Sequence, residues 1–121
     1  MTNESDLLRG NTPTLILAVL MDGPQHGYAI AQEINRQTDS SLKFKQGTLY
    51  AMLHKLESDE LVLGEWQHVE GERPRLVYAI TEAGREALAE RVATWNRFAR
   101  AMDRMIGGIQ IPTGEQHEQP A

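Results

Sequence analysis

The side chains best suited to chemistry in this chain are basic and polar ones gathered near its middle. No acidic residue occurs from Ser40 to Leu56. The basic residues of this segment and of the one after it are Lys43, Lys45, Lys55, Arg73 and Arg75. Lysine and arginine bind phosphate groups, and phosphate contacts supply much of the affinity of proteins for nucleic acid. The pattern therefore predicts a phosphate-binding surface, with double-stranded DNA as the expected partner.

A helix expected to begin near Gln46 must position most of this surface. The apolar residues whose spacing gathers them on one face of it are Leu49, Met52, Leu53 and Leu56. Its other residues are small, polar or basic, and they are Gly47, Thr48, Tyr50, Ala51, His54, Lys55 and Ser58. Such an outer face fits the major groove of DNA, which is about 12 Å wide. The residues expected to contact DNA are Lys43, Lys45, Thr48, Tyr50, Ala51, His54, Lys55, Arg73 and Arg75.

Several of these residues also have a structural interpretation. Tyr50 lies at the edge of the apolar face and can pack beside Leu49 and Leu53 instead of binding DNA. Thr48 can hydrogen-bond within the start of its own helix, and each lysine can be a solvated surface charge. Which of the two arginines contacts DNA stays open.

Other kinds of chemistry find no support in the residues. The chain has no cysteine, which excludes a disulfide framework, thiol catalysis and cysteine-bound zinc. Its four histidines, at positions 26, 54, 68 and 117, lack the spacing of a metal site, and no nucleophile arrangement or phosphate-binding glycine loop occurs. We therefore expect no metal, no cofactor and no enzyme activity, and only a local hydrogen bond from His26.

Start and stop signals divide the chain into helix, helix, helix, hairpin and helix. Thr12 and Pro13 predict the start of the first helix, and the second follows Gly27. Segments 61–69 and 76–80 suit two strands, and Thr81 caps a long last helix. The expected fold is mainly α with a small two-stranded β wing, that is, a winged helix-turn-helix plus a long C-terminal helix. The expected parts are an N-terminal arm (1–11), a DNA-binding domain (12–80), a dimerisation helix (81–107) and a disordered tail (108–121).

The last helix should reach beyond its own domain, since 26 residues span roughly 39 Å. Its apolar stripe alternates in steps of four and three and consists of Leu88, Val92, Trp95, Ala99, Met102 and Ile106. Exposed in one chain, such a stripe needs a partner helix, which predicts a homodimer. The chain's own segment around Leu7, Leu8 and Ile16 can also cover part of it. Trp95 is either a buried interface aromatic or, with Met102, a stacking site for a small planar aromatic effector.

The overall charge and hydropathy set further limits. The formal net charge is −5, which argues against binding DNA through bulk charge alone. The longest apolar run, residues 15–21, is too short to span a membrane. We therefore expect a cytoplasmic protein with no membrane contact.

Three motifs resemble those of the PadR-like family of transcriptional regulators. They are Asp22-Gly23-Pro24-Gln25-His26-Gly27-Tyr28, then Gly47-Thr48-Leu49-Tyr50 with Leu53-His54-Lys55-Leu56-Glu57, and finally Gly71-Glu72-Arg73-Pro74-Arg75 with Tyr78 and Thr81-Glu82-Ala83-Gly84. The single C-terminal helix is similar to that of the short subfamily. The resemblance implies a homodimeric winged-helix repressor, in some members with a small aromatic effector. The two-fold symmetry of such a dimer predicts a palindromic operator.

This chain departs from the family pattern at a few positions. Lys45 and Gln46 stand where Ser-Pro is usual, which removes a capping hydroxyl. Glu60 stands where glycine usually ends the helix that begins near Gln46, and a left-handed backbone there would cost on the order of 1 kcal/mol.

The hypothesis that competes with a DNA-binding regulator is a winged-helix protein-interaction adaptor that does not bind DNA.

Overall fold

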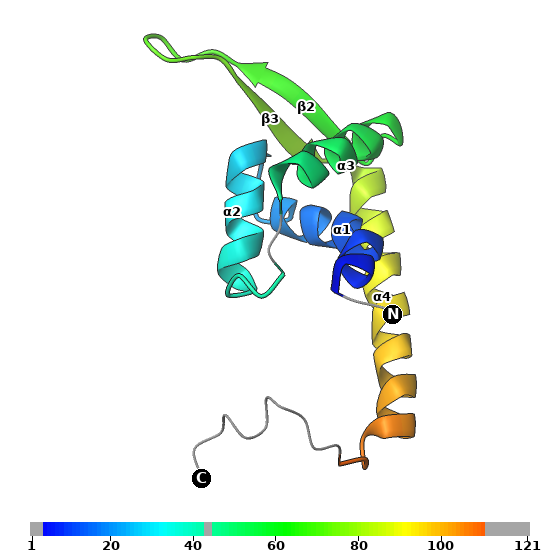
Figure 1. The fold of residues 1–121 in the computed structure, drawn as a ribbon. Coiled ribbons are helices and arrows are strands. Elements are labelled where there is room, and N and C mark those ends of the chain that lie inside the picture. Colours follow the sequence, from blue (N-terminus) through cyan, green and yellow to red (C-terminus); the bar gives the residue numbers. More distant parts are fainter. Residues whose placement is uncertain (1–3, 43–44, 111–121) are drawn as a thin grey trace.

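The computed structural model describes residues 4–42 and 45–110, and it has the expected mainly α fold with a small β wing (Figure 1). Its elements are α1 (Glu4–Leu20), β1 (Gln25–His26), α2 (Gly27–Gln37), α3 (Gln46–Ser58), β2 (Val62–Gln67), β3 (Arg75–Ile80) and α4 (Glu82–Ile106). Lys43 and the tail from residue 111 lie outside the described residues.

The sheet has three strands rather than the two expected from the sequence. Its order is β1-β3-β2, and both pairs are antiparallel. β1 consists of Gln25, opposite Tyr78, and His26, opposite Val77. The predicted two-stranded wing is confirmed by β2 and β3. The strand β1 was not predicted, because a two-residue strand is too short to show the alternation by which strands are recognised in a sequence.

The first helix begins at Glu4, so the predicted start at Thr12 was wrong. Pro13 lies inside α1, where its missing N–H interrupts the helical hydrogen bonds. The Thr12 hydroxyl donates to the carbonyl oxygen of Leu8 at 2.8 Å across this turn. Thr12 and Pro13 are both buried, and tertiary packing therefore holds the helix together through the proline.

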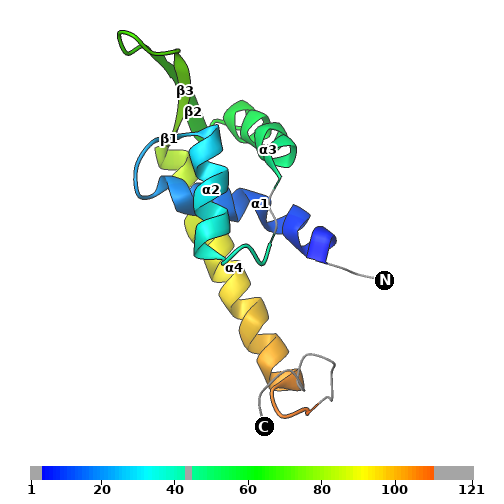
Figure 2. The same ribbon diagram turned by 60° about the vertical axis from the view of Figure 1, so that its left-hand side comes forward.

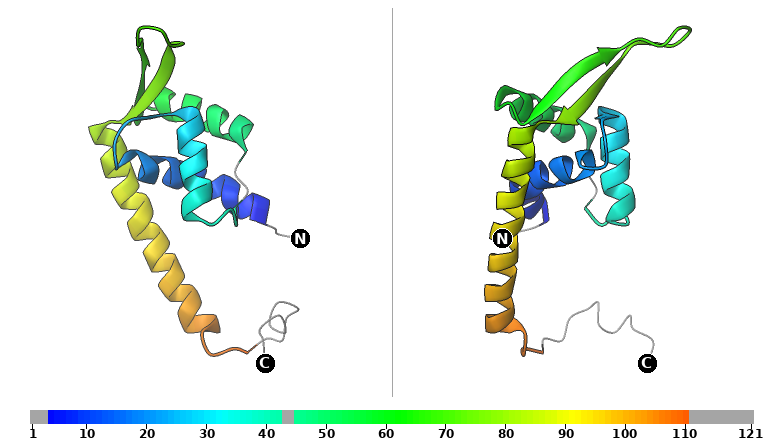
Figure 3. Two further views of the ribbon diagram at one scale, coloured as in Figure 1. Left: turned by 90° about the vertical axis from the view of Figure 1, so that its left-hand side faces the viewer. Right: turned by 180° about the vertical axis from the view of Figure 1, so that it is seen from behind.

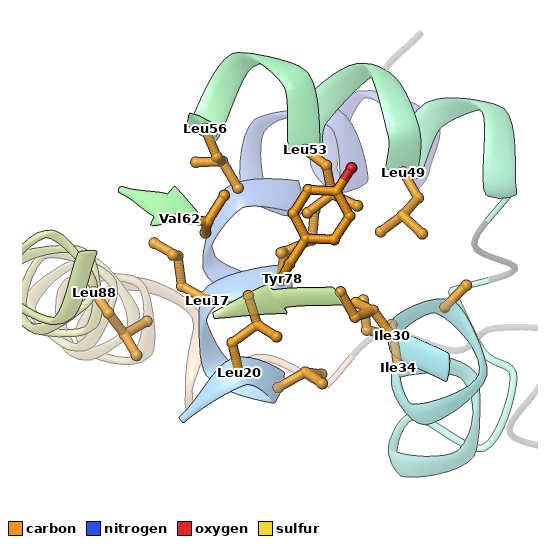
Figure 4. Close-up of a cluster of buried hydrophobic side chains, with 13 residues drawn as sticks. Leu17, Leu20, Ile30, Ile34, Leu49, Leu53, Leu56, Val62, Tyr78 and Leu88 are labelled. Atoms are coloured by element: carbon orange, nitrogen blue, oxygen red, sulfur yellow. The ribbon is translucent and has the colours of Figure 1, made fainter. Parts of the chain in front are cut away.

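The core forms where α1, α2, α3, the sheet and the start of α4 meet (Figure 4). Its residues are Ile16, Leu17, Val19, Leu20, Ile30, Ala31, Ile34, Leu49, Leu53, Leu56, Val62, Tyr78 and Leu88. The predicted apolar face of α3 is confirmed, because its leucines are buried in this cluster, and Ile30, Ala31 and Ile34 of α2 belong to the same cluster. The Tyr78 side chain rises from β3 toward α3 (Figure 4).

A compact junction joins the turn after α3 to the start of α4. Thr81 caps α4 as predicted, since its hydroxyl accepts from the Gly84 N–H at 3.0 Å. The same hydroxyl donates to the carbonyl oxygen of Glu60 at 2.7 Å, and the Thr81 N–H donates to that of Leu61 at 3.0 Å. A Cβ atom on Gly84 would lie 2.1 Å from the Leu61 carbonyl oxygen. Only glycine fits at this point.

Beyond the junction, α4 leaves the domain as a long arm (Figures 2 and 3). Its first turns pack on α1, with Leu88 in the core and the Arg91 guanidinium 3.5 Å from the Thr14 hydroxyl. Its second half extends away from the other helices, and apolar side chains from Val92 to Ile106 are exposed there. The predicted projection of this helix is confirmed.

Glu60→Gly should raise the free energy of unfolding by about 1 kcal/mol, because Glu60 has a left-handed backbone with φ 65° that glycine adopts without strain. Urea denaturation measures the change. The matched control is Glu90→Gly on the exposed side of α4, which should lower the free energy of unfolding by about 1 kcal/mol. A Glu60→Gly protein that is less stable than the wild type would contradict the conclusion that the backbone at Glu60 is strained.

Candidate nucleic-acid interface

Helix α3 presents the predicted outer face to solvent. Gly47, Ala51, His54 and Ser58 are exposed, while the leucines on the opposite side are buried. Lys45 occupies the N-cap without a side-chain hydrogen bond, as expected from the missing serine. At the other end of the helix, a Glu57 carboxylate oxygen accepts from the Gly64 N–H of β2 at 3.2 Å. This bond fixes the wing beside α3.

Tyr50 lies on the flank of α3 that faces the start of α2. A Cβ atom on Gly27 would be 2.6 Å from both the Cε1 atom and the hydroxyl oxygen of Tyr50. The ring therefore packs on the bare backbone of Gly27, a contact that sequence spacing does not reveal. About 42% of Tyr50 stays exposed.

Tyr78 stands next to this flank. Burial raises the pKa of Tyr78, and the negative charge of Glu57 raises it further. Its hydroxyl therefore stays protonated at neutral pH. His26, on the neighbouring strand, makes the expected local bond, because its Nδ1 atom accepts from the Ala29 N–H at 3.4 Å.

The basic side chains of this region differ in how freely they can bind phosphate. Lys45, Arg73 and Arg75 are exposed. Lys55 is exposed too, but its ammonium lies 3.5 Å from the Asp59 carboxylate one turn later. Arg36 is paired with Glu33, and hydrogen bonds from Arg36 and Gln37 lower the pKa of that carboxyl to about 2. Arg36 is thus less available than its position suggests.

The wing is a long hairpin that projects past α3 (Figures 1 and 3). Gly71 takes a left-handed conformation at its tip, with φ 84°. Glu70 and Glu72 share the tip with Arg73 and Arg75, so its formal charges cancel. Trp66 on β2 is 63% exposed.

The comparisons with known proteins agree with this architecture. The sequence profile of the transcriptional regulator PadR-like family matches residues 16–90, which is more than half of the chain. The chain belongs to this family. Its members are transcriptional regulators rather than enzymes.

Individual relatives of this PadR-like regulator show how far the likeness extends. It is 39% identical over 99 residues to the transcriptional regulator Rv3488 of Mycobacterium tuberculosis, covering 82% of this chain and 86% of the relative. A transcriptional regulator from Clostridium thermocellum has a similar structure, with a TM-score of 0.77 and 27% identity over 84% of this chain and 98% of that one. Bacillus subtilis PadR, solved in complex with operator DNA, shares the fold with a TM-score of 0.61 and 20% identity, over 67% of this chain and 46% of that one.

The apolar stripe of α4 is partly as expected for this PadR-like regulator. Val92, Trp95, Met102 and Ile106 are exposed, and Ala99 is half-buried. Leu88 is only 8% exposed and belongs to the chain's own core, so its assignment to a dimer surface was wrong. Phe98 was not predicted, because it lies off the four-and-three alternation. It is exposed, and its ring centre is 6.1 Å from that of Trp95.

The described part of the chain contains neither a metal site nor a membrane-spanning helix. No group of three or more histidine, aspartate or glutamate side chains there is arranged to hold a metal ion. Within the same residues, no helix is long and apolar enough to cross a membrane.

Gly27→Ala tests whether the position of Tyr50 matters for DNA binding. The added methyl group would force the ring away from α2. Because the ring is half exposed and can move, the free energy of unfolding should change by less than about 1 kcal/mol. Affinity for DNA should fall about fivefold, as for one lost hydrogen bond. Thermal denaturation and fluorescence anisotropy with a labelled duplex measure the two effects.

Gly10→Ala is the matched control, since a Cβ atom there meets nothing within 4 Å. It should leave DNA affinity unchanged. Equal DNA affinity of the Gly27→Ala protein and the wild type would show that the placement of Tyr50 is irrelevant to DNA.

Proposed function

We propose that this PadR-like regulator is a homodimeric repressor that binds a palindromic operator through α3 and the wing. The observation that carries the proposal is the outer face of α3, which is exposed, small and polar, and is free of acidic side chains from residue 46 to residue 56. Small side chains let a helix approach base edges closely in the major groove, while flanking cations meet phosphates. Bacillus subtilis PadR, which shares the fold, binds operator DNA, and this supports DNA as the partner.

The proposed contacts follow from the positions of the side chains. His54, Ala51 and Thr48 face the bases or the edge of the groove, and Tyr50 donates to the backbone from the flank of α3. Lys45 and Lys55 bind phosphates beside the helix, and Arg73 or Arg75 does so from the wing. Lys43 belongs to the same proposal by its sequence position.

The proposed homodimerisation follows from the exposed apolar side chains on the second half of α4. The exposed side of α4 carries Val92, Trp95, Met102 and Ile106, and a second copy of the same helix would bury them. Residue Ala99 at the middle of this stripe allows two helices to approach closely. A two-fold axis through the arms would place two α3 helices on successive major grooves, about 34 Å apart.

The proposed effector is a small planar aromatic molecule bound at the arm. Trp95 and Phe98 offer two exposed rings on neighbouring positions of α4, and Met102 is an adaptable neighbour one turn on. A ligand between two such arms would change the spacing of the α3 helices and release the operator.

The proposed location is the cytoplasm, since the chromosomal DNA that a repressor binds lies there.

His54→Ala with Lys55→Ala should weaken binding to the DNA upstream of the protein's own gene about 100-fold, because it removes one base contact and one phosphate contact. Electrophoretic mobility shifts at fixed salt measure the loss. Arg100→Ala, which removes a positive charge from the far side of α4, is the control and should bind like the wild type. Undiminished binding by the double variant would exclude α3 as the DNA-reading helix. A wild-type protein that binds no DNA would favour the adaptor hypothesis, and the net charge of −5 is consistent with that hypothesis.

Met102→Glu should convert the dimer into a monomer, because two carboxylates would face each other in an apolar interface. Sedimentation velocity measures the mass, and the affinity for a two-site operator should fall about 100-fold with it. Arg100→Glu places the same side chain on the opposite side of α4 and should remain dimeric. A monomeric wild type would contradict the proposal directly.

Planar aromatic dyes should quench the fluorescence of Trp95 by stacking on its ring. Titrations of the wild type and of Trp95→Ala measure the effect, and the alanine variant should lose most of the quenching. Unchanged quenching in that variant would move the effector site away from the arm.

A further inference from the structure

One face of the wing carries an apolar row that runs outward from the core. Side chains alternate between the two faces of a strand. On β2 this face holds Val62, Gly64 and Trp66, and the residues opposite them on β3 are Ile80, Tyr78 and Leu76. The Tyr78 side chain points toward α3 (Figure 4). The whole row therefore looks toward the α3 side of the wing.

The inner part of this row packs in the core, and its outer end at Trp66 is exposed. Val62 and Tyr78 are buried in the core, and Leu76 is half-buried against it. A Cβ atom on Gly64 would lie 3.1 Å from the Tyr78 ring and 3.3 Å from a Leu76 methyl group, so both side chains pack across that glycine. Trp66 at the outer end is 63% exposed. The largest apolar side chain of the wing thus extends a packed row into solvent.

The place of Trp66 in the fold argues for DNA as the molecule that covers it. The Glu57–Gly64 bond holds this face beside α3, which is the helix proposed to enter the major groove. The charges at the wing tip cancel, and bulk attraction therefore cannot hold the wing on DNA. An indole ring has an apolar body and one N–H donor, and the DNA backbone offers an apolar deoxyribose next to a phosphate acceptor. The two surfaces are chemically complementary.

We propose that Trp66 is a positioning residue for DNA, whose indole packs on a backbone deoxyribose beside the α3 groove and donates to the adjoining phosphate. The contact deepens the proposed DNA-binding function and rests on it. It is independent of base sequence, and it orients the wing where charge does not. A second copy of the chain is the competing cover, but the proposed dimer surface lies on α4, at the opposite end of the molecule (Figure 3).

The first test compares two exposed apolar residues of the same strand. Trp66→Ala should weaken binding about tenfold, and equally for the upstream DNA and for an unrelated duplex. The control is Leu63→Ala, since Leu63 is 52% exposed on the other face of β2 and should not contact DNA. Both variants should keep the melting temperature of the wild type, because neither side chain belongs to the core. Equal binding by Trp66→Ala and the wild type overturns the proposal.

The second test observes Trp66 directly in the full-length chain. The protein has two tryptophans, so labelling with 5-fluorotryptophan gives two fluorine resonances, and Trp66→Phe assigns them. Saturating DNA should shift the Trp66 resonance and remove its H₂O/D₂O solvent isotope shift, with a smaller change at Trp95. A Trp66 resonance unaffected by bound DNA overturns the proposal. A Trp66 resonance that lacks the solvent isotope shift already in the free protein also overturns the proposal, because a second copy of the chain then covers the ring. If the wild type binds no duplex in the anisotropy assay, the proposed function itself fails, whatever Trp66 does.

Discussion

The junction between the turn after α3 and the start of α4 is the constraint on which the rest of the molecule depends. The Thr81 hydroxyl caps α4 and at the same time bonds to the Glu60 carbonyl, while Gly84 packs against the carbonyl of Leu61 with no room for a side chain. A helix N-terminus held at two points against a backbone turn cannot change its angle without breaking hydrogen bonds. Because α3, the wing and α4 all leave from this turn, their relative directions are set together.

This arrangement gives a physical link between the two ends of the molecule. The arm carries exposed aromatic rings at Trp95 and Phe98, and the far end carries the outer face of α3 and the wing. In the proposed dimer, this rigid junction would turn a change in how the two α4 helices pack into a change in the distance between the two α3 helices. The negative net charge fits the same account, since it averages over the chain whereas α3 has no acidic residue before Glu57. In the proposed complex, specific contacts rather than bulk attraction hold the DNA.

Much of this fold was predictable from local signals. Thr81 as a cap, the apolar face of α3 and the hairpin of segments 61–69 and 76–80 each depend on neighbouring residues alone, and the structure confirms them. The errors arose where distant segments decide the outcome. Buried packing carries α1 through Pro13, and β1 exists only because β3 lies beside it.

In the candidate site, too, features set by neighbouring residues were predictable and features set by distant segments were not. Spacing identified which residues of α3 are exposed, but it could not show that Tyr50 packs on Gly27, since these positions belong to different helices. Leu88 fitted the stripe of α4 by periodicity, although its own domain already buries it. Periodicity gives the side of a helix on which a residue lies, but not which molecule covers that side.

The salt dependence of binding to the DNA upstream of the protein's own gene tests the central claim most directly. Four exposed basic side chains per protomer, Lys45, Lys55, Arg73 and Arg75, lie on the proposed surface. If Lys45, Lys55 and one of the two arginines each meet a phosphate in both protomers of a dimer, the logarithm of the association constant should fall linearly with the logarithm of salt concentration, with a slope of about −5. A slope near zero, or no binding at nanomolar protein in low salt, would contradict the account.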